Sequence, residues 1–362
     1  MVTLDGLVAL IDGTILNPFL VSLVPPLLHY GFKQPFSVTW PPAGAFALPR
    51  VETGPYIKLA CFFATVGIVL RWNRRSNQAA LNNRMLGSSV VPNKEIALIT
   101  GGAGGIGAML AKRLAAKGVT VVVVDVLPLQ FVPPKSDRKI HHYTCDITDY
   151  DAFEAVVRRI QKEVGHPTLV AANAGIARGK SLLDATRKDI DMTFRVNNIA
   201  LIWTIKLLIP DMIKRNSGHF LITASATAYT TTAYMVDYSA TKAAALSIWE
   251  GLQAELAHVY KAPKVRCSVI CPSLIKTKMF DGLNNPDNFF APPLEPDYVA
   301  QLMADCLLSG QAQHIFCPSA AGNIVTYLRA WPSWMRVGIQ AATYKVASDL
   351  KGHDPLALKN SK

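Results

Sequence analysis

The sequence predicts an α/β fold, a doubly wound parallel sheet with helices on both faces, preceded by a hydrophobic membrane extension. From residue 94 onward, short and continuous apolar runs alternate with helical stretches. Strands that are buried on both faces of a parallel sheet have this apolar character. The 362 residues suffice for one such domain of roughly 250 residues with appendages. We therefore expect a ligand site at the carboxyl ends of the strands.

The predicted elements follow from these runs in order along the chain. Seven strands are expected, at Ile96–Thr100, Val119–Asp125, Ile140–Cys145, Leu169–Ala172, His219–Ala224, Val265–Cys271 and His314–Cys317. Six helices are expected between them, at Ile106–Lys117, Asp151–Val164, Asp184–Arg195, Val196–Arg215, Tyr238–Tyr260 and Pro296–Leu308. This alternation predicts a catalytic domain over residues 94–320.

Residues 1–72 are expected to anchor the chain to a membrane. Two apolar runs lie here, Leu7–Leu28 and Ile57–Leu70, and arginines follow the second. The second run has 14 residues, fewer than the roughly 20 of a spanning helix, so a hairpin dipping into one leaflet is an alternative to a span. The arginines predict that the catalytic domain faces the cytosol. Residues 73–93, polar and rich in Asn and Arg, are expected to be a linker.

Other interpretations of the two ends remain open. The first run could be a cleaved signal peptide, although it lacks a basic start and carries Asp5 and Asp12. Both runs could also be buried helices of a soluble core. Residues 321–362 form a tail with Trp334 and a helical spacing over Gln340–Lys351, which suits either a membrane interface or a helix packed on the domain.

Composition favours a membrane surface over nucleic acid. The net charge is +12 and half of the residues are hydrophobic. A nucleic-acid site is disfavoured because no arginine-rich stripe with interleaved aromatic residues is present. The six cysteines show no C-x-x-C spacing, so no metal site or disulfide framework is predicted. Cys267 and Cys271, on one face of a predicted strand, are expected to fill the core.

A glycine-rich motif, TGGAGGIG, directly follows the first predicted strand. Its glycines allow a sharp turn and a close approach of backbone N–H groups to a pyrophosphate at the start of the next helix. The motif therefore predicts a Rossmann-like dinucleotide site. The candidate residues are Thr100, Gly101, Gly105, Ile106 and Gly107.

Further cofactor residues are expected after the next strands. Asp125 ends the second strand, where a carboxylate accepts hydrogen bonds from the adenosine ribose and repels a 2′-phosphate. NAD(H) is therefore favoured, with NADP(H) possible. Asp146 and Ile147 are candidates for the adenine, although Asp146 could instead cap a helix. The floor of the site is assigned to Asn173, Ala174 and Gly175.

The reaction centre is predicted at Tyr238 and Lys242. Four residues apart, they share one face of a helix. An ammonium group beside a phenol lowers its pKa, as a general acid/base needs. Ser225, thirteen residues before the tyrosine, would hold the substrate oxygen, with Thr223 and Thr227 as competitors.

In this order the motifs resemble the short-chain dehydrogenase/reductase family over about residues 94–320. The resemblance implies hydride transfer between an alcohol or ketone and a nicotinamide, with Tyr238 and Lys242 also binding the cofactor. It implies that Asn197, rather than the adjacent Asn198, holds a water in a proton relay. It also places Pro272 and Thr277 at the nicotinamide, although Ser273 replaces the family's glycine.

The extension, Asp125 and the phrase VDYSATK resemble the membrane-associated branch that includes retinol dehydrogenases and 17-beta-hydroxysteroid dehydrogenases. This implies a location on endoplasmic reticulum or lipid droplets and a lipophilic small-molecule substrate. A homodimer is possible by analogy. The apolar loop Ser273–Pro293 would close over the substrate, or simply pack on the surface.

Two other functions compete with a lipophilic alcohol dehydrogenase. One is the 3-ketoacyl reductase step of fatty-acid elongation, for which NADPH would be expected, against Asp125. The other is a non-catalytic, nucleotide-binding membrane scaffold. The set Ser225, Tyr238 and Lys242 argues against it, because a pure binder needs no activated phenol.

Overall fold

The computed structural model describes residues 3–23, 53–85, 87, 89–133, 140–283, 289–348 and 350. Its contacts divide the chain into two compact units, Met1–Ala80 and Leu81–Lys362. The second unit contains the sheet and every predicted site residue. Parts of the runs expected at Leu7–Leu28, Ser273–Pro293 and Gln340–Lys351 lie outside the described residues.

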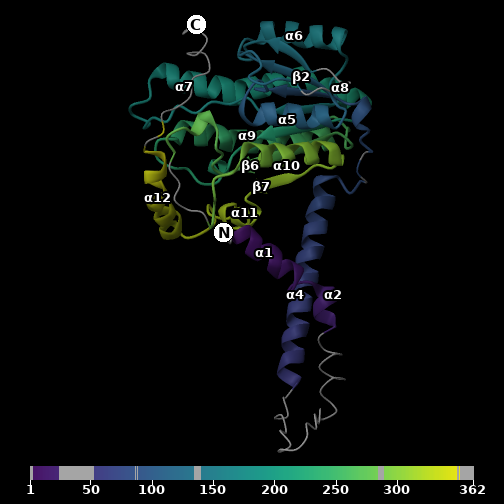
Figure 1. The fold of residues 1–362 in the computed structure, drawn as a ribbon, viewed down its shortest axis with the longest axis vertical. Helices are drawn as coiled ribbons and strands as arrows, with labels where there is room; N and C mark the ends of the chain where they lie inside the picture. The colour runs from purple at the N-terminus through teal and green to yellow at the C-terminus, as the bar shows by residue number, and fades with distance from the viewer. Residues whose placement is uncertain are drawn as a thin grey trace, which may run out of the picture. The chain divides into compact units, whose positions relative to one another are not determined.

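The sheet of the second unit has seven parallel strands in the order β3-β2-β1-β4-β5-β6-β7 (Figure 1). Strands β2 and β3 lie on one side of β1, and strands β4 to β7 lie on the other. This order creates a topological switch point between β1 and β4. All seven predicted strands are confirmed to within two residues: β1 Ile96–Thr100, β2 Thr120–Asp125, β3 Ile140–Thr144, β4 Leu169–Ala172, β5 His219–Thr223, β6 Arg266–Pro272 and β7 His314–Cys317.

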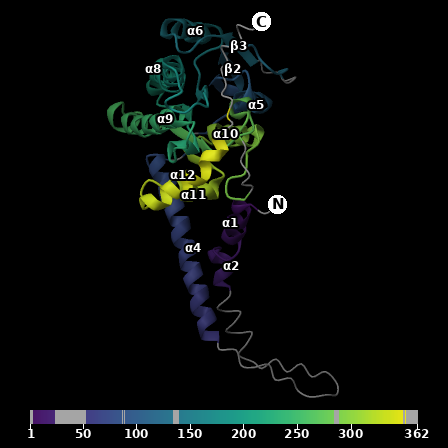
Figure 2. The same ribbon diagram turned by 90° about the vertical axis from the view of Figure 1, so that its left-hand side faces the viewer.

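Alternate residues of the strands enter two hydrophobic cores, one on each face. Leu98, Val122 and Val170 pack with helices α6 (Tyr150–Glu163), α8 (Ala200–Arg215) and α9 (Val236–Ala254). Ile99 and Val123 pack with α5 (Gly105–Ala116) and α10 (Pro296–Ser309). Figure 2 shows α8 and α9 on one side and α5 and α10 on the other. Cys267 and Cys271 are buried together in the first core, as predicted.

The remaining helices differ from the expected ones in their bounds and in two π-helical turns. Helix α7 (Arg187–Phe194) starts later than expected because Thr186 and Asp189 form a capping box at its amino end. A π-helical turn, Arg195–Ile199, joins it to α8, and a second, Glu255–Val259, extends α9. Short 3-10 turns lie at Pro92–Lys94, Ala226–Ala228 and Lys278–Phe280. Helices α11 (Ser319–Val325) and α12 (Ser333–Ala347) follow the sheet.

Among the described residues, the continuous helical stretch Arg187–Arg215 is long and apolar enough to cross a membrane, but 44% of its most apolar part is buried. Because α8 contributes to the core on one face of the sheet, this stretch belongs to the folded domain.

The described part of the first unit contains α1 (Leu4–Gly13), α2 (Pro18–Ser22) and α4 (Thr53–Leu81), whose last residue falls in the second unit. Arg74 forms an ion pair with Asp12 at 2.6 Å, and a side chain at Gly67 would collide with the carbonyl oxygen of Leu16. The turn after α1 therefore packs directly on the backbone of α4. Residues 73–81, expected within a linker, continue this helix, because they include good helix formers.

The apolar side chains of this unit are largely exposed. On α4, Phe62 is 60% and Trp72 is 68% exposed, and on α2 Phe19 is 73% exposed. Helix α1 has no buried residue. The described parts of the two N-terminal runs therefore carry large exposed apolar side chains.

A histidine of β5, His219, is kept neutral by burial and has hydrogen-bond partners on both ring nitrogens. Gln313 N–H donates to Ser268 Oγ at 2.8 Å, which leaves the Ser268 hydroxyl to donate to His219 Nε2 at 2.7 Å. His219 Nδ1 then donates to the carbonyl of Leu307 at 3.3 Å. Burial lowers the pKa of His219 to about 4. A proton on Nε2 would break this network and charge the core.

We expect the free energy of unfolding to fall as the pH drops from 6.5 to 4. The folded pKa of His219 lies below the unfolded value, so its contribution is complete above pH 6.5 and declines toward pH 4. The loss is on the order of 3 kcal/mol. Denaturant unfolding at pH 7 and pH 4.5 measures it. In His219→Gln this part of the pH dependence should disappear; an unchanged pH profile would contradict the assignment.

Candidate active site

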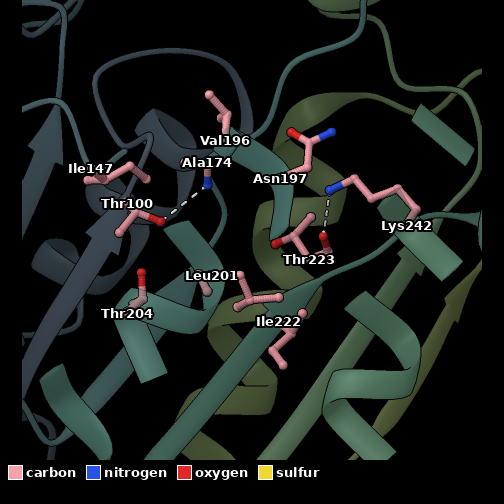
Figure 3. Close-up of a pocket in the computed structure, with 11 residues that line it drawn as sticks. Thr100, Ile147, Ala174, Val196, Asn197, Leu201, Thr204, Ile222, Thr223 and Lys242 are labelled. Atoms are coloured by element: carbon pink, nitrogen blue, oxygen red, sulfur yellow. Dashed lines mark hydrogen bonds between the residues drawn. The ribbon is translucent and has the colours of Figure 1, made fainter. Parts of the chain in front are cut away.

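The hydroxyl group of Thr100 links the carboxyl end of β1 to the segment after β4 by hydrogen bonds. Thr100 Oγ1 accepts hydrogen bonds from the N–H groups of Asn173 at 3.1 Å and Ala174 at 3.2 Å; Figure 3 shows the second bond. The Asn173 amide donates in return to the carbonyl of Gly101 at 3.1 Å. The two segments predicted to bind the cofactor therefore meet at the switch point.

Three glycines of the motif are required by its geometry. Gly101 and Gly105 adopt φ values of +67° and +55°, which favour glycine. A Cβ on Gly107 would lie 2.2 Å from the carbonyl oxygen of Gly101. Helix α5 starts here, with Gly104 as N-cap and no side chain bonded to its free N–H groups. These donors and the helix dipole fit a pyrophosphate.

Asp125 ends β2, as predicted, and its carboxylate is bonded to backbone on both oxygens. Ala103 N–H donates to Oδ2 at 2.9 Å, and Leu127 N–H donates to Oδ1 at 3.0 Å. Asp125 therefore joins the glycine motif to the segment after β2. A carboxylate has about four acceptor positions, so capacity for a ribose remains.

Asp146 is not the helix cap that the alternative suggested. Asp149 caps α6, accepting from Ala152 N–H at 3.0 Å. Asp146 is exposed and accepts two hydrogen bonds from Thr148. Ile147, next to it, is buried and lines a small cavity under the carboxyl ends of the strands.

The π-helical turn brings two consecutive asparagines into the interior. Asn197 Oδ1 accepts from Ile176 N–H at 2.9 Å, and its Nδ2 donates to the Ile176 carbonyl at 3.0 Å and to Thr241 Oγ1 at 2.9 Å. Asn198 donates to the Thr241 carbonyl at 2.9 Å. Asn197 thus connects the segment after β4 to α9. Thr241 was not singled out in the sequence, although it lies inside the YSATK phrase.

Tyr238 and Lys242 share one face of α9, as their spacing predicts. Lys242 Nζ lies 5.6 Å from the centroid of the tyrosine ring and donates to the carbonyl of Thr223 at 2.8 Å. Figure 3 shows Lys242 and Asn197 reaching toward each other near Thr223. A Cβ on Gly175 would lie 3.4 Å from Asn197 Oδ1 and 3.5 Å from Lys242 Nζ. The predicted site residues Gly175, Asn197, Tyr238 and Lys242 therefore lie close together.

The pKa of Tyr238 differs from the sequence expectation. The tyrosine is 5% exposed, and burial raises its pKa to about 12, opposed by a hydrogen bond with Ser225 that lowers it. Burial also lowers the pKa of Lys242 to about 8. The expected lowering by Lys242 is absent: the Lys242 ammonium bonds to the Thr223 carbonyl, and desolvation of the phenol dominates.

Ser225 is distinguished from its two competitors by this contact with Tyr238. Its Oγ also accepts from Thr227 N–H at 3.2 Å and donates to the Pro272 carbonyl at 3.4 Å. The hydroxyl groups of Thr223 and Thr227 are buried and have no hydrogen-bond partner among the described residues. Of the three hydroxyl groups, only that of Ser225 lowers the pKa of the phenol.

Pro272 and Thr277 lie at the end of β6 and in the segment that follows it. Pro272 ends β6, and a Cβ on Gly105 would lie 3.9 Å from the methyl group of Thr277. Ser273, which replaces the family's glycine, does not adopt a positive φ, so the turn requires no glycine.

An apolar cluster that the sequence predicted only in part contains the Tyr238 side chain. Its five buried members are Ala177, Met235, Tyr238, Ala347 and Leu350, which we call the Tyr238 cluster. Met279, Phe280 and Leu283 pack against it, and the rings of Phe280 and Tyr238 meet edge to face at 6.0 Å. The apolar loop expected to close over the substrate supplies Met279, Phe280 and Leu283, whereas the contribution of Ala347 and Leu350 was not predicted.

Fold and site together define an oxidoreductase with a dinucleotide cradle beside a buried Tyr–Lys–Ser set. The family model described as short chain dehydrogenase matches residues 95–288, and the chain belongs to this family. It is an NAD(P)-dependent oxidoreductase acting on CH–OH groups.

Characterised relatives and a solved structure are similar to this chain. Human epidermal retinol dehydrogenase 2 is 30% identical, with 62% of this chain and 74% of the relative covered. Rat estradiol 17-beta-dehydrogenase 11 is 30% identical, with coverage of 66% and 80%. The fold is shared with 3-ketoacyl-(acyl-carrier-protein) reductase from Brucella melitensis, at a TM-score of 0.53 and 23% identity, with coverage of 62% and 96%.

Proposed function

We propose that the protein interconverts a lipophilic alcohol, such as a steroid, retinoid or long-chain alcohol, with its ketone or aldehyde. The observation that carries the proposal is the Tyr238 cluster, because apolar side chains surround the one phenol positioned for acid/base chemistry. The names of the relatives, which are retinol and estradiol dehydrogenases, agree with this substrate class.

In this mechanism Tyr238 exchanges the hydroxyl proton of the substrate, and Ser225 binds the same oxygen. The nicotinamide, when bound, accepts or supplies the hydride. The raised pKa of Tyr238 keeps the phenol protonated at neutral pH, which suits donation to a forming alkoxide. Asn197 and Lys242 line a cavity with room for about one water molecule, which supports a role for both in carrying protons to Tyr238.

We propose NAD(H) as the preferred cofactor because Asp125 places a negative charge at the end of β2. Asp125→Asn keeps an acceptor for one backbone N–H group while it removes the charge. The ratio of kcat/KM for NADPH to that for NADH should rise by about 10-fold, as expected for the loss of roughly 1.4 kcal/mol of repulsion. Steady-state kinetics of the full chain in detergent measures it.

Asp151→Asn, on the exposed surface of α6, is the control and should leave this ratio unchanged. A wild-type preference for NADPH would contradict the proposal and promote the ketoacyl reductase alternative.

We propose that the first unit attaches the protein to a membrane, with the catalytic domain facing the cytosol on endoplasmic reticulum or lipid droplets. The exposed apolar side chains of α4 carry this proposal, because soluble proteins rarely expose large contiguous apolar surface. Phe62→Lys with Val69→Lys, seven residues apart on one face, should shift the protein from the membrane to the soluble fraction after alkaline extraction. Val132→Lys with Val259→Lys, exposed in the second unit, should not.

A further inference from the structure

The C-terminal segment is fastened to the loop that precedes Tyr238. Gln340 Nε2 donates to the Thr231 carbonyl at 3.1 Å, and the hydroxyl groups of Thr343 and Thr232 lie 3.1 Å apart. Arg329 donates to the Ala228 carbonyl at 2.8 Å. These bonds orient α12 so that Ala347, four residues after Thr343, reaches the Tyr238 cluster on the same helix face.

Leu350 packs against the backbone of Gly179. Gly179 adopts φ +67°, and a Cβ there would lie 2.7 Å from both Leu350 Cγ and the Leu350 carbonyl oxygen. Leu350 is only 6% exposed and belongs to the same cluster as Ala177 and Tyr238. The absence of a side chain at position 179 is therefore what allows Leu350 to pack this closely.

Helix α12 has two different faces. Ala347 is fully buried, whereas Trp334, Val337 and Tyr344, at helical spacings of three and seven residues, are exposed. Only the inward face, through Ala347, meets the residues around the phenol. The outward face of the same helix therefore supplies a control position that is remote from the cluster.

We propose that Ala347 and Leu350 form a wall of the substrate site and determine the size of the alcohol or ketone that reaches Tyr238. The inference rests on the proposed function. A substrate whose oxygen meets Tyr238 must place its carbon skeleton among the members of the Tyr238 cluster, and the C-terminal segment supplies two of its five buried side chains. The wall comes from a region more than 100 residues from the catalytic tyrosine.

The test compares Ala347→Val and Leu350→Ala with the control Val337→Ala. Each full-length variant in detergent is assayed with primary alcohols of increasing chain length, with retinol and with estradiol, and cofactor affinity is measured by fluorescence. Ala347→Val should lower kcat/KM for the bulkiest active substrate by about 10-fold or more, mainly through KM, and spare the shortest. Leu350→Ala should shift the preference toward bulkier substrates. Val337→Ala should match the wild type.

Cofactor affinity should change less than about twofold in all three variants, because none of the three positions is a predicted cofactor residue. Gly179→Ala, whose added Cβ would lie 2.7 Å from Leu350 Cγ, should also change the size preference, because it displaces Leu350. If Ala347→Val and Leu350→Ala changed kcat/KM equally for every substrate, or not at all, the proposal that these residues determine substrate size would be wrong. Absence of wild-type turnover with all of these substrates despite cofactor binding would instead overturn the proposed function, and the wall with it.

Discussion

Tyr238→Phe should lower kcat by about 10²–10⁴-fold and leave cofactor affinity nearly unchanged. The substitution removes the hydroxyl group that we propose exchanges the substrate proton, and general acid/base groups contribute this much to rates. The ring, its burial and its contact with Phe280 are retained, so the fold should tolerate the change. Turnover of lipophilic alcohols with NADH, together with cofactor binding monitored by fluorescence, measures both quantities.

Tyr229→Phe is a suitable control for Tyr238→Phe. Tyr229 also lies near the site, but its hydroxyl group bonds to His314 Nε2 at 2.9 Å and has no role in the proposed reaction. Its loss should alter kcat far less. If Tyr238→Phe retained wild-type turnover with every active substrate, Tyr238 would not be the acid/base group.

Gly107→Ala should abolish detectable cofactor binding and destabilise the domain. The added Cβ would lie 2.2 Å from the Gly101 carbonyl oxygen and 2.9 Å from Gly102 Cα. Both are backbone atoms, so the glycine loop itself must move. Overpacking of this kind costs about 1–3 kcal/mol, and the displaced loop would no longer present its N–H groups to a pyrophosphate. Calorimetric titration with NADH and thermal unfolding measure the two effects.

Gly251→Ala is the matched control, since Gly251 lies inside α9 and a Cβ there meets nothing within 4 Å. This substitution should stabilise the protein by about 0.5–1 kcal/mol and leave binding intact. Tight NADH binding by Gly107→Ala would show that the cofactor does not use this loop.

The strands could be predicted because their signal is local. Continuous runs such as Val121–Val124 are buried on both faces, so hydrophobicity alone marks them. The two π-helical turns carry no such signal. The turn at Arg195–Ile199 is held by contacts of Asn197 and Asn198 with Thr241, more than 40 residues away.

For the site, spacing predicted which residues meet but not their electrostatics. Lys242 and Tyr238 share a helix face, yet the carbonyl that accepts from Lys242 belongs to Thr223, on strand β5. The resulting pKa of Tyr238 depends on how deeply the phenol is buried, which is a property of the folded chain. The position of Leu350 also depends on the folded chain, because Gly179, on which it packs, is more than 150 residues away in sequence.

The bond between Thr100 and the segment after β4 affects how the nucleotide is bound. Thr100 Oγ1 and the Asn173 amide fix the start of the glycine loop against its neighbour in the free protein. The conformational entropy of these residues is therefore lost during folding. Preorganisation of this kind reduces the ordering cost at the moment of association. Binding should then have a small entropic penalty from the protein backbone, and removing the Thr100 hydroxyl should weaken affinity chiefly through that entropy.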